Sequence, residues 1–144
     1  MTNFLKLVSV LSLVGSTAIA GGHASGDAAK GEKTMKKCKA CHQIIDDAGT
    51  VLFKGGKTGP NLYGLAGRKA ASIEGFRYGK SIMALGETDF VWDEAEFVSY
   101  VADPNKYLKA KLDDSSARSK MSFKLRKDEE ALNVWAYIVS LSEQ

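Results

Sequence analysis

The sequence predicts a single all-α domain, and three observations lead to this prediction. Asp27 can cap a helix that runs through residue 35, and residues 128–141 have the pattern of an amphipathic helix, so helices are expected near both ends of the mature chain. A helix-capping signal over residues 92–97 predicts another helix between them. The chain of 144 residues has the length of one domain. A brief β-turn or strand is expected at residues 51–53 at most.

Residues 1–20 have the pattern of an export signal. Lys6 follows a short polar start, and residues 7–20 are apolar without further charge. The segment ends in Ala-Ile-Ala, a small-x-small pattern, so we expect cleavage after Ala20 and a mature domain of residues 21–144. The apolar run is short and contains Ser, Thr and Gly, which disfavours the alternative of an uncleaved membrane anchor.

The first part of the mature domain is expected to contain one helix and a long loop. Residues 21–26 are predicted to form a mobile N-terminus, after which Asp27 caps the first helix. Gly31 lies inside this helix, and close approach of the C-terminal helix would explain a glycine there. Residues 46–60 are rich in Gly and Lys, so we expect a loop.

The second half contains the clearest helix signals. Asp93 is the predicted N-cap and Glu96 lies at N3, where its side chain would return the capping bond. An Asp-Pro pair ends this helix and caps a short one over residues 103–109, followed by a charged, serine-rich loop at 111–120. The last helix has apolar residues at helical spacing: Leu132, Trp135, Ala136 and Val139.

Residues 38–42 read Cys-Lys-Ala-Cys-His, a spacing with one well-defined chemical use. The two thiols can each add to a vinyl group of haem, while the histidine directs an imidazole nitrogen at the iron. Zinc would need about four ligands, and the chain has two Cys and two His. A thioredoxin-like dithiol would follow a strand, and a disulfide at this spacing has poor geometry. The motif therefore predicts a c-type cytochrome with one covalently bound haem c.

Haem iron bound by His42 has a second axial position, and its occupant decides between electron transfer and ligand chemistry. His23 lies in the terminus that we expect to be mobile, and Met35 lies on the helix next to the cysteines. Met83 belongs to an apolar run for which core packing is the better explanation. Met121 lies far along the chain, after a charged loop, and is the predicted ligand. An open or lysine-ligated iron is the alternative.

The charge is nearly balanced overall but uneven along the chain. The sequence has 20 Lys and Arg against 17 Asp and Glu. Residues 21–80 carry 11 basic and 5 acidic side chains, whereas residues 81–144 carry 8 and 12. We therefore expect a dipolar molecule. Nucleic-acid binding is not expected, because it would require a markedly basic total with a clustered basic face.

Four landmarks follow one another in the sequence. They are the motif at 38–42, Thr58-Gly59-Pro60-Asn61-Leu62-Tyr63-Gly64, Tyr100 to Tyr107 with Asp103-Pro104, and Lys120-Met121-Ser122-Phe123. In this order they resemble the landmarks of class I cytochromes c, most closely the bacterial cytochrome c2 (c550-like) family, over residues 27–141. The resemblance implies helices wrapped around one covalently attached haem, with the N- and C-terminal helices packed together.

The resemblance also implies roles for individual residues. Cys38 and Cys41 would anchor the haem, with His42 and Met121 as the axial ligands of the iron. Pro60 would accept a hydrogen bond from the other imidazole nitrogen of His42, which fixes the tautomer of the ring.

Further residues match positions around the haem in this family. Arg68, Tyr78 and Trp92 match positions that hydrogen-bond the haem propionates, and Tyr100 matches one close to the methionine sulfur. The loops at 46–57 and 111–120 are longer than in the minimal family form.

The implied function is a monomeric, periplasmic one-electron carrier and not an enzyme. The implied donor is a cytochrome bc1 complex, and the acceptor is a photosynthetic reaction centre or a terminal cytochrome c oxidase. We expect a ring of lysines at the haem edge: Lys36, Lys39, Lys54, Lys57, Lys106, Lys120 and Lys124. The alternatives are a haem enzyme or gas sensor with a displaceable methionine, and an electron-transfer module fixed at the membrane.

Overall fold

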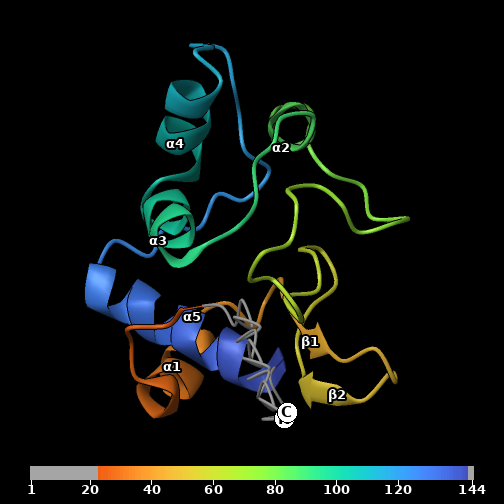
Figure 1. Cartoon of the computed structure of the whole chain (residues 1–144), viewed down its shortest axis with the longest axis vertical. Coiled ribbons are helices and arrows are strands. Elements are labelled where there is room, and N and C mark those ends of the chain that lie inside the picture. The colour runs from red at the N-terminus through yellow and green to blue at the C-terminus, as the bar shows by residue number, and fades with distance from the viewer. Residues whose placement is uncertain (1–22, 143–144) are drawn as a thin grey trace, which may run out of the picture.

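The computed structural model describes residues 23–142, and the predicted signal segment 1–20 lies outside this range. Within it, helices carry most of the regular structure, which confirms the all-α prediction (Figure 1). The elements are α1 (Ala28–Met35), β1 (Ile44–Ile45), β2 (Val51–Phe53), α2 (Lys80–Gly86), α3 (Glu94–Ala102), α4 (Pro104–Lys111) and α5 (Asp128–Ser142). None of the helices between residues 23 and 142 is long and apolar enough to cross a membrane.

The N- and C-terminal helices α1 and α5 cross at the base of the molecule in Figure 1. Gly31 lies at the crossing, where an added Cβ would lie 1.9 Å from the carbonyl oxygen of Asn133. The side chain of Asn133 in turn accepts a hydrogen bond of 2.7 Å from the N–H of Asp27. Met35 and Ile138 are fully buried in the core. The prediction that the glycine allows close approach of the C-terminal helix is confirmed.

The segment before α1 is docked on the helices, so the expected mobility is wrong for residues 23–26. The N–H and the hydroxyl of Ser25 each donate a hydrogen bond of 2.7 Å to the Glu94 carboxylate. The indole N–H of Trp135 donates to the carbonyl oxygen of His23 at 2.9 Å. A Cβ at Gly26 would lie 2.2 Å from a carbonyl oxygen of α5. The small residues that suggested mobility instead allow the backbone to lie against α5.

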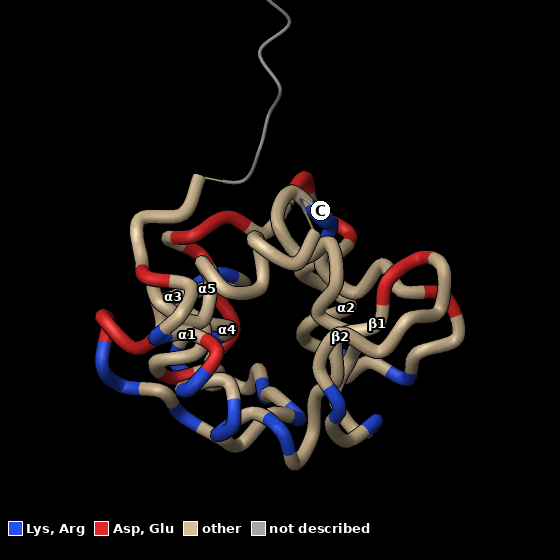
Figure 2. The backbone as a smooth tube through the Cα atoms, turned by 90° about the horizontal axis from the view of Figure 1, so that it is seen from below, with Lys and Arg blue, Asp and Glu red and all other residues tan. Residues whose placement is uncertain are grey.

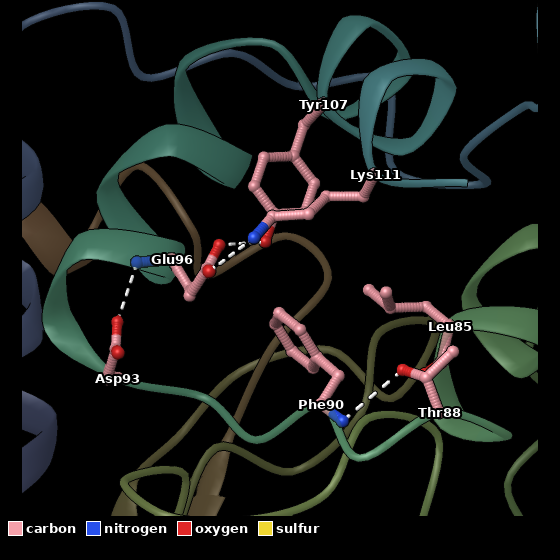
Figure 3. Close-up of polar contacts among 7 residues, drawn as sticks. All are labelled: Leu85, Thr88, Phe90, Asp93, Glu96, Tyr107 and Lys111. Atoms are coloured by element: carbon pink, nitrogen blue, oxygen red, sulfur yellow. Dashed lines mark hydrogen bonds and ion pairs between the residues drawn. The ribbon is translucent and has the colours of Figure 1, made fainter. Parts of the chain in front are cut away.

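Helices α3 and α4 begin at the predicted caps. The Asp93 carboxylate accepts from the N–H of Glu96 at 2.8 Å, and Asp103 caps α4 in the same way at 3.1 Å. The prediction that the Glu96 side chain returns the capping bond is wrong. Its carboxylate accepts from the Tyr107 hydroxyl and the Lys111 ammonium instead (Figure 3). The Lys111 ammonium carries a full positive charge and the Tyr107 hydroxyl adds a second donor, so this pairing offers the carboxylate more than the single backbone N–H of the N-cap.

Helix α2 was not predicted from the sequence, and its position corrects the interpretation of Met83, which lies on it. The interpretation of Met83 as a core residue is wrong, because it is 51% exposed. Ile82 and Leu85, three positions apart, contribute the buried side of the helix. Gly79 precedes α2 and offers no side-chain cap, so the start of this short helix has no capping signal in the sequence.

The loop that precedes Pro60 is fixed by a small hairpin. Strands β1 and β2 pair antiparallel, with Ile44 opposite Phe53. The amide of Asn61 binds both backbone groups of Ile45, accepting from its N–H at 3.0 Å and donating to its C=O at 2.7 Å. This side chain continues the ladder beyond the hairpin and holds the chain around Pro60 in place.

Candidate haem site

A cavity of about 330 Å³ lies at the centre of the domain. Figure 2 shows the chain encircling this region, with α1, α3, α4 and α5 on one side and α2 and the hairpin on the other. The structure places every site residue named from the sequence in the lining of this one cavity: Cys38, Cys41, His42, Pro60, Arg68, Tyr78, Trp92, Tyr100 and Met121. Cys38 and Met121, which are 83 positions apart in the chain, thus face a common space.

The Cys-x-x-Cys-His segment forms a tight turn directly after α1. The N–H groups of Cys41 and His42 both donate to the carbonyl oxygen of Cys38, at 3.1 and 2.9 Å. Both thiols are free, and burial raises the pKa of the Cys38 thiol to about 11. Within residues 23–142 no group of three or more His, Cys, Asp or Glu side chains could hold a metal ion, so the zinc alternative lacks its ligands there.

A glycine-rich loop covers this turn. A Cβ at Gly55 would lie 1.8 Å from the carbonyl oxygen of His42, and one at Gly59 would lie 2.4 Å from Cε1 of the His42 ring. The N–H of Gly59 donates to the carbonyl oxygen of Cys41 at 2.8 Å. The loop packs backbone against backbone, so side chains are excluded. From the sequence this segment was predicted only as a loop. Its several glycines were the available signal that it packs closely against another part of the chain.

The hydrogen bonding of the His42 imidazole leaves one ring nitrogen available as a metal ligand. Its Nδ1 lies 2.9 Å from the carbonyl oxygen of Pro60. Since a carbonyl can only accept, Nδ1 carries the proton and Nε2 retains a lone pair. Burial lowers the pKa of His42, which keeps the ring neutral although the bond to Pro60 opposes this effect. A neutral imidazole with one nitrogen fixed is the form that binds haem iron.

Met121 reaches the same cavity from the segment after α4. Its N–H donates to the hydroxyl oxygen of Ser119 at 3.0 Å, and the same hydroxyl lies 2.9 Å from that of Tyr100. Burial raises the pKa of Tyr100, so its phenol is neutral at ordinary pH. Ser119 also lines the cavity and was missed by sequence reasoning, because a single serine in a charged loop gives no signal.

Arg68 places a positive charge in the wall of the cavity. Its guanidinium donates to the carbonyl oxygens of Tyr63 and Asn61, at 2.9 and 3.0 Å, and not to a carboxylate. Burial lowers the pKa of Arg68, but arginine remains protonated in proteins. The phenol oxygen of Tyr78 accepts a 3.3 Å hydrogen bond from the N–H of Ile73. A partly buried cation held by carbonyl groups fits an anionic substituent of a bound group.

The remaining lining is apolar and aromatic. The rings of Trp92 and Tyr100 pack edge to face at 5.2 Å, and Trp92 meets Phe90 in the same way at 4.9 Å. Aliphatic side chains complete the wall: Leu62, Leu65, Ile82, Val101 and Val134. Two thiols, an imidazole, a thioether and one cation in an apolar cavity match the functional groups of haem: its vinyl groups, iron and propionates.

The comparisons with known proteins agree with this chemistry. No protein-family profile matches the chain. Cytochrome c-551 of Roseobacter denitrificans is 50% identical over 142 residues, covering 99% of this chain and 97% of that protein. Cytochrome c2 of Rhodobacter capsulatus is 47% identical over 137 residues, covering 95% and 98%.

This chain belongs to the bacterial cytochrome c2 family.

Solved structures agree with the assignment. Cytochrome c2 of Paracoccus denitrificans aligns with a TM-score of 0.79 at 49% identity, covering 83% of this chain and 98% of that one. The Rhodobacter capsulatus cytochrome c2 structure gives 0.76 at 52% identity, covering 81% and 98%. The class I fold and one covalently bound haem c follow for this chain as a member of a family of electron carriers.

Basic residues surround one side of the cavity. Figure 2 shows Lys and Arg positions following one another along the lower rim of the view. Lys37, Lys69 and Lys120 themselves line the cavity. Of the lysines expected at the haem edge, Lys124 is paired within the protein, because its ammonium lies 2.6 Å from the Asp103 carboxylate.

Proposed function

We propose that this member of the cytochrome c2 family is a periplasmic one-electron carrier whose haem is anchored by Cys38 and Cys41 and ligated by His42 and Met121. The observation that carries the proposal is that these four side chains line one cavity although Met121 lies in a distant part of the sequence. Haem with both axial positions filled supplies one-electron exchange between ferric and ferrous iron. The signal would be removed after Ala20.

The surrounding residues would bind and orient the group and would take no part as acids, bases or nucleophiles. Pro60 fixes the ring of His42 through the 2.9 Å hydrogen bond. Arg68 would neutralise a propionate, with Tyr78 and Trp92 as neighbouring donors in the lining. An apolar wall and a thioether ligand both favour the ferrous state over the ferric state. This preference suits a carrier that delivers electrons to a strong oxidant.

The proposed donor is a cytochrome bc1 complex, and the proposed acceptor is a reaction centre or a cytochrome c oxidase. Docking would use the lysines beside the Cys–His turn and its glycine loop. Lys39, Lys54 and Lys57 are exposed and belong to these two segments. A carrier must dock briefly and leave, so the contact is expected to be small and steered by charge.

Addition of carbon monoxide tests whether both axial positions of the haem iron are filled by the protein. We expect the absorption spectrum of the dithionite-reduced, haem-loaded protein to be unchanged by the gas, with sharp low-spin bands. In the Met121→Ala variant the Soret band should shift on addition of the gas, because the sixth position is then open. A shift in the wild-type protein would favour the haem enzyme or gas sensor instead.

Charge reversal tests the docking face. The triple change of Lys39, Lys54 and Lys57 to Glu should slow bimolecular oxidation of the ferrous protein by a cytochrome c oxidase or a reaction centre at low salt and flatten the salt dependence of the rate. Lys33→Glu controls for added negative charge outside the proposed face, because Lys33 is exposed on α1 and belongs neither to the Cys–His turn nor to the glycine loop. Equal rates for the triple variant and the wild type at low salt would show that docking uses another face.

A further inference from the structure

The segment that carries Met121 is held from one side by a short stretch of chain, residues 100–105, which we call the α3–α4 corner. Asn105 of this corner accepts a hydrogen bond of 2.8 Å from the backbone N–H of Ser119. Tyr100 of the same corner lies 2.9 Å from the Ser119 hydroxyl, which in turn accepts from the N–H of Met121 at 3.0 Å. Ser119 is therefore fixed at both its backbone and its side chain.

The corner also holds the residues that follow Met121. The N–H of Leu125 donates to the carbonyl oxygen of Val101 at 2.8 Å. The ammonium of Lys124 pairs with Oδ2 of Asp103 at 2.6 Å, while Oδ1 of the same carboxylate caps α4. Hydrogen bonds before and after Met121 thus come from residues that lie within six positions of one another.

Contacts on the opposite side of the segment are more exposed. The ammonium of Lys120 donates to the carbonyl oxygen of Arg77 at 3.0 Å, and the N–H of Arg118 donates to the Ser81 hydroxyl at 3.0 Å. Both donors belong to exposed residues, whereas Asn105 and Ser119 are partly buried. Water replaces an exposed hydrogen bond more easily than a buried one, so the corner should contribute more to the position of Met121.

We propose that Asn105 is a positioning residue for the axial ligand, acting through Ser119, and that the Asp103–Lys124 ion pair is a second, salt-sensitive hold on the same segment. This inference rests on the proposed ligation of the iron by Met121. When the corner is weakened, the segment moves away more readily and an external ligand takes the sixth position at lower concentration.

The test uses two variants of Asn105 in the haem-loaded protein. Asn105→Leu keeps the approximate size but removes the acceptor, whereas Asn105→Asp keeps an acceptor oxygen and suits the first turn of α4. The measurements are the dissociation constant of imidazole for the ferric protein and the charge-transfer band of methionine-ligated ferric haem. We expect Asn105→Leu to bind imidazole about tenfold more tightly than the wild type, and Asn105→Asp to stay within about twofold.

The dependence on salt concentration distinguishes the Asn105–Ser119 hydrogen bond from the Asp103–Lys124 ion pair. Lys124→Met should tighten imidazole binding a few-fold at low ionic strength, and this effect should shrink at about 1 M salt. The effect of Asn105→Leu should persist, because a hydrogen bond between neutral groups is not screened. Lys106→Met is the matched control, since it removes a lysine from α4 that forms no hydrogen bond to the Met121 segment.

Unchanged imidazole affinity and an unchanged charge-transfer band in Asn105→Leu would overturn the inference. Asn105→Ala is the second variant, used if Asn105→Leu fails to load haem; it removes the same acceptor and should also bind imidazole more tightly than the wild type. Ser119→Ala keeps the backbone N–H that Asn105 binds and tests the Ser119 hydroxyl separately. Met121→Ala separates the two proposals. If it opens the iron while Asn105→Leu and Ser119→Ala behave as wild type, only the positioning role fails; if it changes nothing, the ligation by Met121 fails as well.

Discussion

Replacing Gly31 by alanine should destabilise the protein, although alanine is the better helix former. The added Cβ would lie 1.9 Å from the carbonyl oxygen and 2.6 Å from the carbonyl carbon of Asn133. These atoms belong to the backbone of α5, so no side chain can move aside. Ordinary contact needs about 3.4 Å, and α1 and α5 would therefore have to separate by about 1.5 Å at their crossing.

The magnitude follows from two opposing contributions. Overpacking of a close contact costs about 3 kcal/mol at the upper end of its range, which applies because rigid backbone blocks the methyl group. Alanine in place of glycine returns about 1 kcal/mol of helix propensity. We expect a net loss of about 2 kcal/mol in the free energy of unfolding. Urea unfolding of the haem-loaded protein, followed by far-UV circular dichroism, measures this difference.

Ala29→Gly in the same helix isolates the propensity contribution. Ala29 is exposed, so this change should cost about 1 kcal/mol without affecting the crossing. If packing against α5 did not matter, Gly31→Ala would stabilise the protein by the same amount. A Gly31→Ala variant that is as stable as the wild type, or more stable, would refute the close-packing argument.

Two further predictions concern the glycine loop and the α3–α4 contact. Gly59→Ala should lower the yield of haem-loaded protein and weaken the axial bond of His42, because the new methyl group would meet the imidazole at 2.4 Å; equal yield and an unchanged ferrous spectrum would contradict this. Burial alone would raise the pKa of Glu96, but hydrogen bonds from Lys111 and Tyr107 lower it below its ordinary value (Figure 3). The contact therefore stabilises the fold above the unfolded-state pKa of about 4.3 and is lost as the pH falls through the folded-state pKa. Urea unfolding at pH 6 and pH 3 should show a smaller loss of stability for Glu96→Gln than for the wild type, and equal losses would contradict the assignment.

Local signals predicted the helices whose ends are marked by their own residues. Asp93 and Asp103 cap α3 and α4 as expected, because an N-cap needs only a side chain three positions from its partner. Helix α2 was missed because Gly79 provides no such cap and the segment is short. The prediction that Met83 is buried was also wrong. In a short helix such as α2 one side packs on the core, and an apolar residue on the other side is exposed to solvent.

In the candidate site, too, local motifs could be predicted from the sequence, whereas contacts between distant segments could not. The Cys-x-x-Cys-His motif is local, so its chemistry could be predicted from spacing alone, and the resemblance supplied the residues of the more distant wall. Asn105 and Ser119 could not be predicted, because their hydrogen bond joins two segments that meet only in the folded chain. The ion pair of Lys124 with Asp103 was missed for the same reason.

The ligation of the iron by Met121 is the central claim, and nuclear magnetic resonance of the reduced protein with labelled methionine methyl groups tests it most directly. A methyl group bound over the haem ring is shifted strongly upfield by the ring current. Residues 21–144 contain Met35, Met83 and Met121, so three signals are expected, one of them shifted. We predict that the shifted signal disappears in Met121→Ala and remains in Met83→Ala. A shifted signal that survives Met121→Ala, or the absence of any shifted signal, would contradict the account.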